Sequence, residues 1–229
     1  ATITRDIRSR KAQEAERDLM YQEEHVRAER DAVLARIGWA IRSSVSPGEV
    51  QAVAVESLGQ ALGCDRSFYL NLDWEADELM IPKDYKIEGL PSATRTGKLS
   101  EGSVDLIALF DRNQTIVVDD IREQSYEAIP KETSERLSQT GLMSFVAVPF
   151  RDSSGQLTSV LACSMSFAPR KWTPAEIHLV EQVATETNEA VEAAIARQRE
   201  RNITQRLQDA LRPPSPRDFP GLRLASSYR

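Results

Sequence analysis

Apolar residues recur at helical spacing in two stretches of the chain. From Pro47 to Leu62 they return every three or four positions, which predicts an amphipathic helix that Gly63 ends with a left-handed cap. A second helix begins at Thr173-Pro174-Ala175-Glu176, where a capping residue, a proline and an acid form a helix-start signature. Its apolar stripe runs to Ala194, and the helical pattern continues through Leu211.

Between these helices the apolar positions alternate or are β-branched, which predicts strands. The predicted strands are Arg66–Leu72, Glu78–Ile81, Thr115–Val118, Phe145–Phe150 and Leu157–Phe167. Short helices are expected over 104–110 and 134–139, and residues 82–98 predict an irregular stretch because they hold two Pro and two Gly. Most of the strands form consecutive hairpins bracketed by helices. The pattern therefore predicts an α+β fold, an antiparallel sheet with helices packed on it.

The chain before Gly38 contains no Gly or Pro and is rich in helix formers. Apolar residues recur every seven positions from Ala12 to Ala40, as in a helix that pairs with another. The second heptad position that such a pair normally buries is mostly charged here, so only a narrow apolar stripe is available for pairing. Because isolated helices are marginal in water, we expect this helix to pair in a homodimer. The alternative is a lone helix that lies on its own domain. The residues expected in the paired flanking helices are Leu19, Val26, Val33, Ile37, Val191, Ala194, Ile203 and Leu207.

The apolar stripe of the last helix changes phase after Ala194. Continuing the stripe would place apolar residues at 198 and 201, but these positions hold Gln198 and Arg201, and the stripe restarts at Ile203. Such a break alters the winding of a paired helix, and it is either a bistable element or a simple junction. After a proline-rich segment, residues 222–229 alternate as a strand without a partner. We therefore expect the chain to be a piece of a longer protein.

Charge and cysteine content narrow the classes of function. The chain has a net charge of −6, and residues 43–195 hold 12 basic and 24 acidic residues, which argues against a nucleic-acid partner. No apolar run approaches the roughly 18 residues of a membrane helix, and the charged N-terminus lacks a signal-peptide core. Only Cys64 and Cys163 are present, which excludes a disulfide framework. A cytoplasmic location without membrane contact is expected.

Three segments carry a family resemblance: Ala61-Leu62-Gly63-Cys64-Asp65-Arg66, the strand Phe145–Phe150 with its hairpin, and the stretch from Pro169 to Glu176. In this order and spacing, residues 37–196 resemble a GAF domain, a small sensory module of bacterial signalling chains. The resemblance implies an antiparallel sheet of about six strands, with helices on one face and a ligand pocket on the other. It also implies dimerisation through the flanking helices.

The flanks resemble parts of other signalling domains. Leu207–Pro214, Pro220–Leu222 and Ala225–Arg229 resemble the entry into a PPM-type serine phosphatase, a family that includes regulators of stress sigma factors and sporulation. The start of the chain, Thr4–Lys11, looks like the exit from a PAS domain. The implied division is a helical linker at 1–36, the GAF domain at 37–196, a helical linker at 197–212 and a truncated phosphatase start at 213–229. The resemblance implies a module that relays an upstream signal to a phosphatase. No phosphatase metal ligand lies in this chain, so no enzyme activity is expected of it.

The ligand question stays open at the level of sequence. The aromatic residues that could reach a GAF pocket, with core packing as the alternative, are Tyr69, Trp74, Tyr85 and Tyr126. Neither the residue set of cyclic-nucleotide GAF domains nor the Cys-His pair of bilin-binding ones can be placed here. Non-covalent ligand binding and a cysteine-based methionine sulfoxide reductase are the alternatives to a pure relay. No metal site or cofactor is expected, because His25 and His178 are far apart in the sequence and have no ligand-spaced partners.

Overall fold

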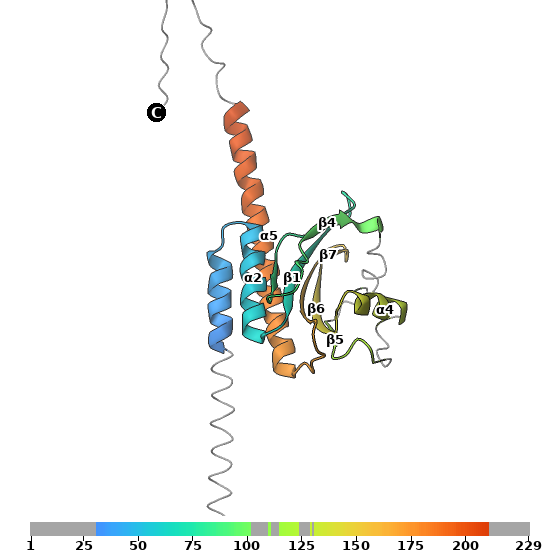
Figure 1. Cartoon of the computed structure of the whole chain (residues 1–229). Helices are drawn as coiled ribbons and strands as arrows, with labels where there is room; N and C mark the ends of the chain where they lie inside the picture. Colours follow the sequence, from blue (N-terminus) through green and yellow to red (C-terminus); the bar gives the residue numbers. More distant parts are fainter. Residues whose placement is uncertain (1–30, 102–109, 111–114, 124–128, 130, 211–229) are drawn as a thin grey trace, which may run out of the picture.

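The computed structural model describes residues 31–101, 110, 115–123, 129 and 131–210 (Figure 1). Three helices lie together on one side of a sheet: the segment 31–43, α2 (Pro47–Leu62) and α5 (Pro174–Ala210). We call the side of the sheet that they cover the helix face and the opposite side the distal face. The helix α4 (Lys131–Gln139) contributes to the core of the distal face through Leu137.

The sheet has seven strands, and every pairing in it is antiparallel. Its order is β4-β2-β1-β7-β6-β5, and β3 pairs with the first half of β1 beside β2. The strands are β1 (Arg66–Asp73), β2 (Glu78–Ile81), β3 (Asp84–Lys86), β4 (Arg95–Lys98), β5 (Ile116–Val118), β6 (Ser144–Arg151) and β7 (Leu157–Met165). The predicted α+β fold with an antiparallel sheet is therefore confirmed.

Each central strand sends alternate residues to two separate cores, because successive side chains of a strand point to opposite faces. Tyr69, Val146 and Leu161 pack under the helices, while Phe145 and Ala162 belong to the core of the distal face. Both faces of the middle strands are thus buried, which explains their nearly continuous apolar sequences.

Residues 82–98, predicted to be irregular, contain the two short strands β3 and β4. β4 is exposed along its whole length and β3 has no buried residue, so neither shows the apolar alternation by which a strand is recognised. They form because β1 and β2 offer unpaired backbone groups at their edges. The short helix predicted over 104–110 lies outside the described residues except for Phe110, which is buried.

Both α2 and α5 begin with a capping pair, and the pair of α5 is the one that the sequence predicts. Ser46 caps α2 in a capping box with Glu49, and hydrogen bonds from the backbone of Val45 and Ser46 lower the pKa of Glu49. Thr173 and Glu176 form the same reciprocal pair at the start of α5. Gly63 ends α2 with φ of 57°, the left-handed cap that the sequence predicts.

The segment 31–43 lies against its own domain. Ile37 is only 2% exposed and packs in the core of the helix face, and Arg42 lies 3.4 Å from Glu186 of α5. Val191 and Ala194 are also buried within this chain. These three apolar residues, predicted to lie in a dimer seam, are buried in the interior of this single chain. Leu19 and Val26 lie outside the described residues, and Val33 is half-buried against the same core.

The helix α5 is continuous through the predicted phase break and spans about 56 Å at 1.5 Å per residue. Burial stops at Ala194, and every side chain from residue 195 to residue 208 is exposed. Ile203 and Leu207 are each 59% exposed on this projecting part (Figure 1). Within the described ranges, no helix combines the length and apolar character needed to cross a bilayer.

Candidate distal-face ligand site

A cavity of about 350 Å³ lies over the distal face of the sheet, and we call it the distal cavity. Strands β1, β6 and β7 form its floor, while the stretch 92–95 and residues near α4 form its walls. Its lining residues are Arg66, Phe68, Leu70, Ile81, Ser92, Ala93, Thr94, Arg95, Phe110, Leu137, Thr140, Leu142, Phe145, Ala147, Val160, Ala162, Ser164 and Ser166.

The strand register orders the floor of the distal cavity from a polar end to an apolar end. Residues paired across β1, β7 and β6 lie side by side in rows. From the polar end, these rows are Arg66, Ser164 and Phe145; then Phe68, Ala162 and Ala147; then Leu70 and Val160. Charge and hydroxyl groups therefore gather at the start of β1, and the remaining floor is apolar.

Asp84 holds the wall 92–95 in place. Its carboxylate accepts hydrogen bonds from the Ala93 backbone N–H at 2.6 Å, the Ser92 hydroxyl at 2.8 Å and the Thr94 hydroxyl at 3.3 Å. Burial alone would raise the pKa of Asp84, but these hydrogen bonds and the charge of Arg66 lower it below its ordinary value. The carboxylate is thus ionised at neutral pH and keeps the wall beside the polar end of the cavity.

Arg66 lies between this wall and the floor. Its Nη2 donates a hydrogen bond to the Pro91 carbonyl at 2.5 Å, and its Nε lies 4.0 Å from a carboxylate oxygen of Asp84. The Nε is buried and has no hydrogen-bond partner among the described residues. The site therefore holds a fixed guanidinium with one buried donor unsatisfied.

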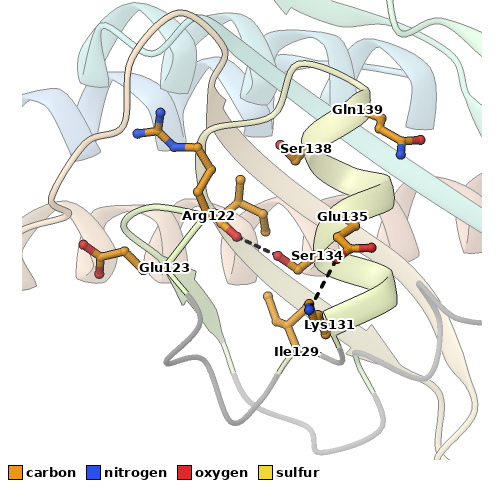
Figure 2. A pocket seen from close by; sticks show the side chains of 9 residues that line it. Arg122, Glu123, Ile129, Lys131, Ser134, Glu135, Ser138 and Gln139 are labelled. Carbon is orange, nitrogen blue, oxygen red and sulfur yellow. Dashed lines mark hydrogen bonds and ion pairs between the residues drawn. The ribbon is translucent and has the colours of Figure 1, made fainter.

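A second cavity, of about 540 Å³, lies between α4 and the loop after β5 (Figure 2). Ser134 donates a hydrogen bond to the Ile121 carbonyl at 2.6 Å, and Lys131 lies 3.9 Å from Glu135 on its wall. Its described lining is mostly polar side chains. We place the candidate site in the smaller distal cavity, because small-molecule sites are lined mainly by apolar groups with a few polar ones.

The comparisons with known proteins agree with this architecture. The family model of the GAF domain matches residues 46–191. The chain belongs to the GAF domain family. A comparison with curated proteins found no match.

Several solved structures share the fold at low sequence identity. The chromophore-binding domain of the bacteriophytochrome RpBphP3 from R. palustris superposes with a TM-score of 0.64 at 12% identity, over 75% of this chain and 62% of that one. JSC1_58120g3 with bound biliverdin superposes with a TM-score of 0.58 at 19% identity, over 71% of this chain and 98% of that one. The GAF domain of an Acinetobacter phosphoenolpyruvate-protein phosphotransferase superposes with a TM-score of 0.55 at 18% identity, over 75% of this chain and 98% of that one. This chain thus spans less than two thirds of the bacteriophytochrome structure.

Of the aromatic residues proposed from sequence for the GAF pocket, the three that the structure describes do not line either cavity. Tyr69 is 1% exposed under the helices, where its hydroxyl lies 2.9 Å from Ser159 Oγ and donates to Asn188 Oδ1 at 3.3 Å. Trp74 stands at the end of β1 and donates from its indole to the Leu157 carbonyl. Tyr85 packs its ring against Gly59 of α2. Tyr126 lies outside the described residues.

The residues that sequence reasoning missed are the neighbours of Tyr69. Phe68 and Leu70 point to the distal cavity, because a shift of one position along a strand exchanges the two faces. The alternation Phe68, Leu70, Leu72 was visible in the sequence and marks one face of β1. Tyr69 points to the helix face instead, where burial raises its pKa to about 12.

Both cysteines lie away from the distal cavity. Cys64 and Cys163 are buried in the core of the helix face, and burial raises the pKa of the Cys163 thiol. Neither thiol is among the residues that line the distal cavity. Within the described ranges, no group of three or more His, Cys, Asp or Glu side chains gathers as a metal site requires.

Proposed function

We propose that this GAF domain is a regulatory module that binds a small molecule non-covalently in the distal cavity and transmits its occupancy through α5. The observation that carries the proposal is the distal cavity itself, a largely apolar hollow on the sheet face that the three helices leave open. Its volume of about 350 Å³ lies within the usual range of small-molecule sites.

A chain of direct contacts leads from the cavity to α5. Phe68 and Leu70 line the cavity, and Tyr69 between them is hydrogen-bonded to Asn188 of α5 on the helix face. A ligand that moves β1 by a fraction of an ångström would therefore change a buried contact of α5. Packed cores favour discrete rearrangements over continuous deformation, so such a shift can bias α5 between two positions.

The exposed end of α5 is the proposed output of the module. Ile203 and Leu207 lie one helical turn apart, and Ala196 extends their stripe seven residues before Ile203. This spacing fits the seam of two paired helices, and we propose a second copy of the chain as the partner. The sequence after α5 resembles the entry into a PPM-type phosphatase. The proposal is that α5 relays the state of the cavity, and any signal from a PAS-like input, to such a domain.

Filling the cavity tests the ligand-binding part of the proposal. Ala162→Leu adds a side chain to the cavity floor, whereas Ala35→Leu adds the same atoms on the exposed side of the segment 31–43. Ligands are sought by native mass spectrometry of the purified chain and by thermal melting against a metabolite panel. A cavity ligand should raise the melting temperature of the chain and of Ala35→Leu, but not of Ala162→Leu. Equal stabilisation of both variants would place the ligand elsewhere.

Charged substitutions test the helix pairing. Ile203→Glu with Leu207→Glu should convert the dimer to a monomer in native mass spectrometry, because acids would replace the seam residues. Gln198→Glu with Gln205→Glu adds the same charge on the opposite side of α5 and should leave the dimer intact. A chain that is monomeric without any substitution, or two double variants that dissociate equally, would contradict the pairing.

A further inference from the structure

We infer that the distal cavity takes a small amphiphilic carboxylate, with its carboxylate at Arg66 and its apolar body along the rows of Phe68 and Leu70. The inference rests on the proposed function that the cavity binds a small molecule, and it adds the chemical class of that molecule. Charge, an unsatisfied donor and the shape of the floor each support it.

The charge of the cavity is opposite to that of the chain. Arg66 and Arg95 are among its lining residues, and no Asp or Glu is among those that the structure describes, although the chain as a whole has a net charge of −6. Asp84 lies behind the wall 92–95 at 4.0 Å from Arg66 and balances one of the two cationic charges. No carboxylate of the described residues pairs with Arg95. A single positive charge is thus left over, which suits a monoanion.

The hydrogen bonds of Arg66 point to a planar acceptor. Its Nη2 is bound to the Pro91 carbonyl, but its buried Nε has no hydrogen-bond partner in the part of the chain that the structure describes. Leaving a buried donor unsatisfied is energetically costly, and a ligand oxygen that accepts from it would recover this energy. Carboxylates match the donor geometry of a guanidinium. Ser164 lies directly beside Arg66 in the same row and can donate a further hydrogen bond.

The remaining floor sets the size and polarity of the ligand body. Beyond the first row the paired residues are Phe68 with Ala162 and Leu70 with Val160, which offer only apolar contact. At about 30 Å³ for each water-sized group, a cavity of 350 Å³ holds on the order of a dozen non-hydrogen atoms. A dianionic phosphate ester would bring two charges to the polar end, where Asp84 already balances one of the two arginines, so it is disfavoured against a monoanion.

A matched set of probes tests the class. The probes are 4-phenylbutyrate, 4-phenylbutan-1-ol and 4-phenylbutylamine, which share one apolar body and differ in the headgroup. Calorimetric titration of the full chain should give a dissociation constant for the carboxylate at least tenfold lower than for the alcohol, and no binding of the amine. Ala162→Leu should abolish binding of the carboxylate, because it fills the floor of the cavity.

Arginine variants locate the headgroup. Arg66→Gln should weaken carboxylate binding at least tenfold and change alcohol binding less than twofold. Arg95→Gln, in an exposed edge strand, should weaken carboxylate binding without affecting folding. This variant replaces Arg66→Gln as the test if the loss of the Arg66–Asp84 pair makes Arg66→Gln unstable. Arg122→Gln removes an arginine from the other cavity and should have no effect on binding.

Two results would overturn the assignment in different ways. If the alcohol or the amine binds as tightly as the carboxylate and Ala162→Leu abolishes that binding, the cavity is a ligand site but its ligand is not a carboxylate. If neither the probes nor any ligand of the metabolite panel binds in a manner that Ala162→Leu abolishes, the proposed function fails together with the inference.

Discussion

Gly59 of α2 gives a sharp test of how the helices lie on the sheet. A Cβ atom at this position would lie 2.1 Å from Cδ1 and 2.5 Å from Cγ of Tyr85, well inside the 3.0 Å that real Cβ atoms keep. The contact is with the base of the ring, so a rotation of the tyrosine's far end cannot relieve it. We therefore predict that Gly59→Ala destabilises the protein, although alanine is the better helix former.

The expected magnitude is the difference of two effects. Replacing Gly by Ala within a helix normally stabilises it by about 1 kcal/mol. Overpacking costs typically about 1–3 kcal/mol, and the short contact at Gly59 places this site in the upper part of that range. The net loss of unfolding free energy is then about 1–2 kcal/mol. For a chain of this length, that loss lowers the melting temperature by roughly 2–8 °C.

The assay is urea denaturation of the full chain, followed by circular dichroism, with two controls. Gly48→Ala, in the first turn of the same helix, meets nothing within 4 Å and should leave stability unchanged or raise it by up to about 1 kcal/mol. In a Tyr85→Ala background the clash is absent, so Gly59→Ala should become stabilising by about 1 kcal/mol. If Gly59→Ala stabilises the chain with Tyr85 present, the packing of β3 under α2 described here is wrong.

Two further substitutions probe the core of the helix face and the start of α5. Tyr69→Phe should cost about 0.5–1.5 kcal/mol, because the hydroxyl's hydrogen bonds with Ser159 and Asn188 are lost. Burial raises the pKa of Tyr69 to about 12, so the hydroxyl loses its proton at a lower pH in the unfolded chain than in the folded one. The contribution of Tyr69 to the free energy of unfolding should therefore be lost between about pH 10 and pH 12. Chemical denaturation across that range should show a steeper loss of stability for the unmodified chain than for Tyr69→Phe, and parallel pH profiles would contradict the buried placement. Thr173→Ala should lower the unfolding free energy by about 1 kcal/mol through loss of the α5 cap, whereas Thr173→Ser should retain most of it.

The amino-acid sequence determines the fold class of this protein and its longer helices and strands, but not the short strands β3 and β4. The capping pairs at Ser46 and Thr173, the left-handed glycine at the end of α2 and the hairpin pattern of the long strands are local signals. Each of them depends on residues only a few positions apart. They predict an antiparallel sheet with helices, and the structure confirms it.

The tertiary structure alone decides which side of the sheet carries the helices and which carries the cavity. In β1 the alternation separates Tyr69 from Phe68 and Leu70, but both sets are apolar enough to be buried. Likewise, Ile37 fits a dimer seam and a protomer core equally well by its spacing. An apolar pattern with a period of two or seven residues predicts that a side chain is buried, but it does not identify the surface that the side chain packs against, because the hydrophobic effect is non-directional. The partner surface, and with it the place of the candidate site, is fixed only when distant segments pack together.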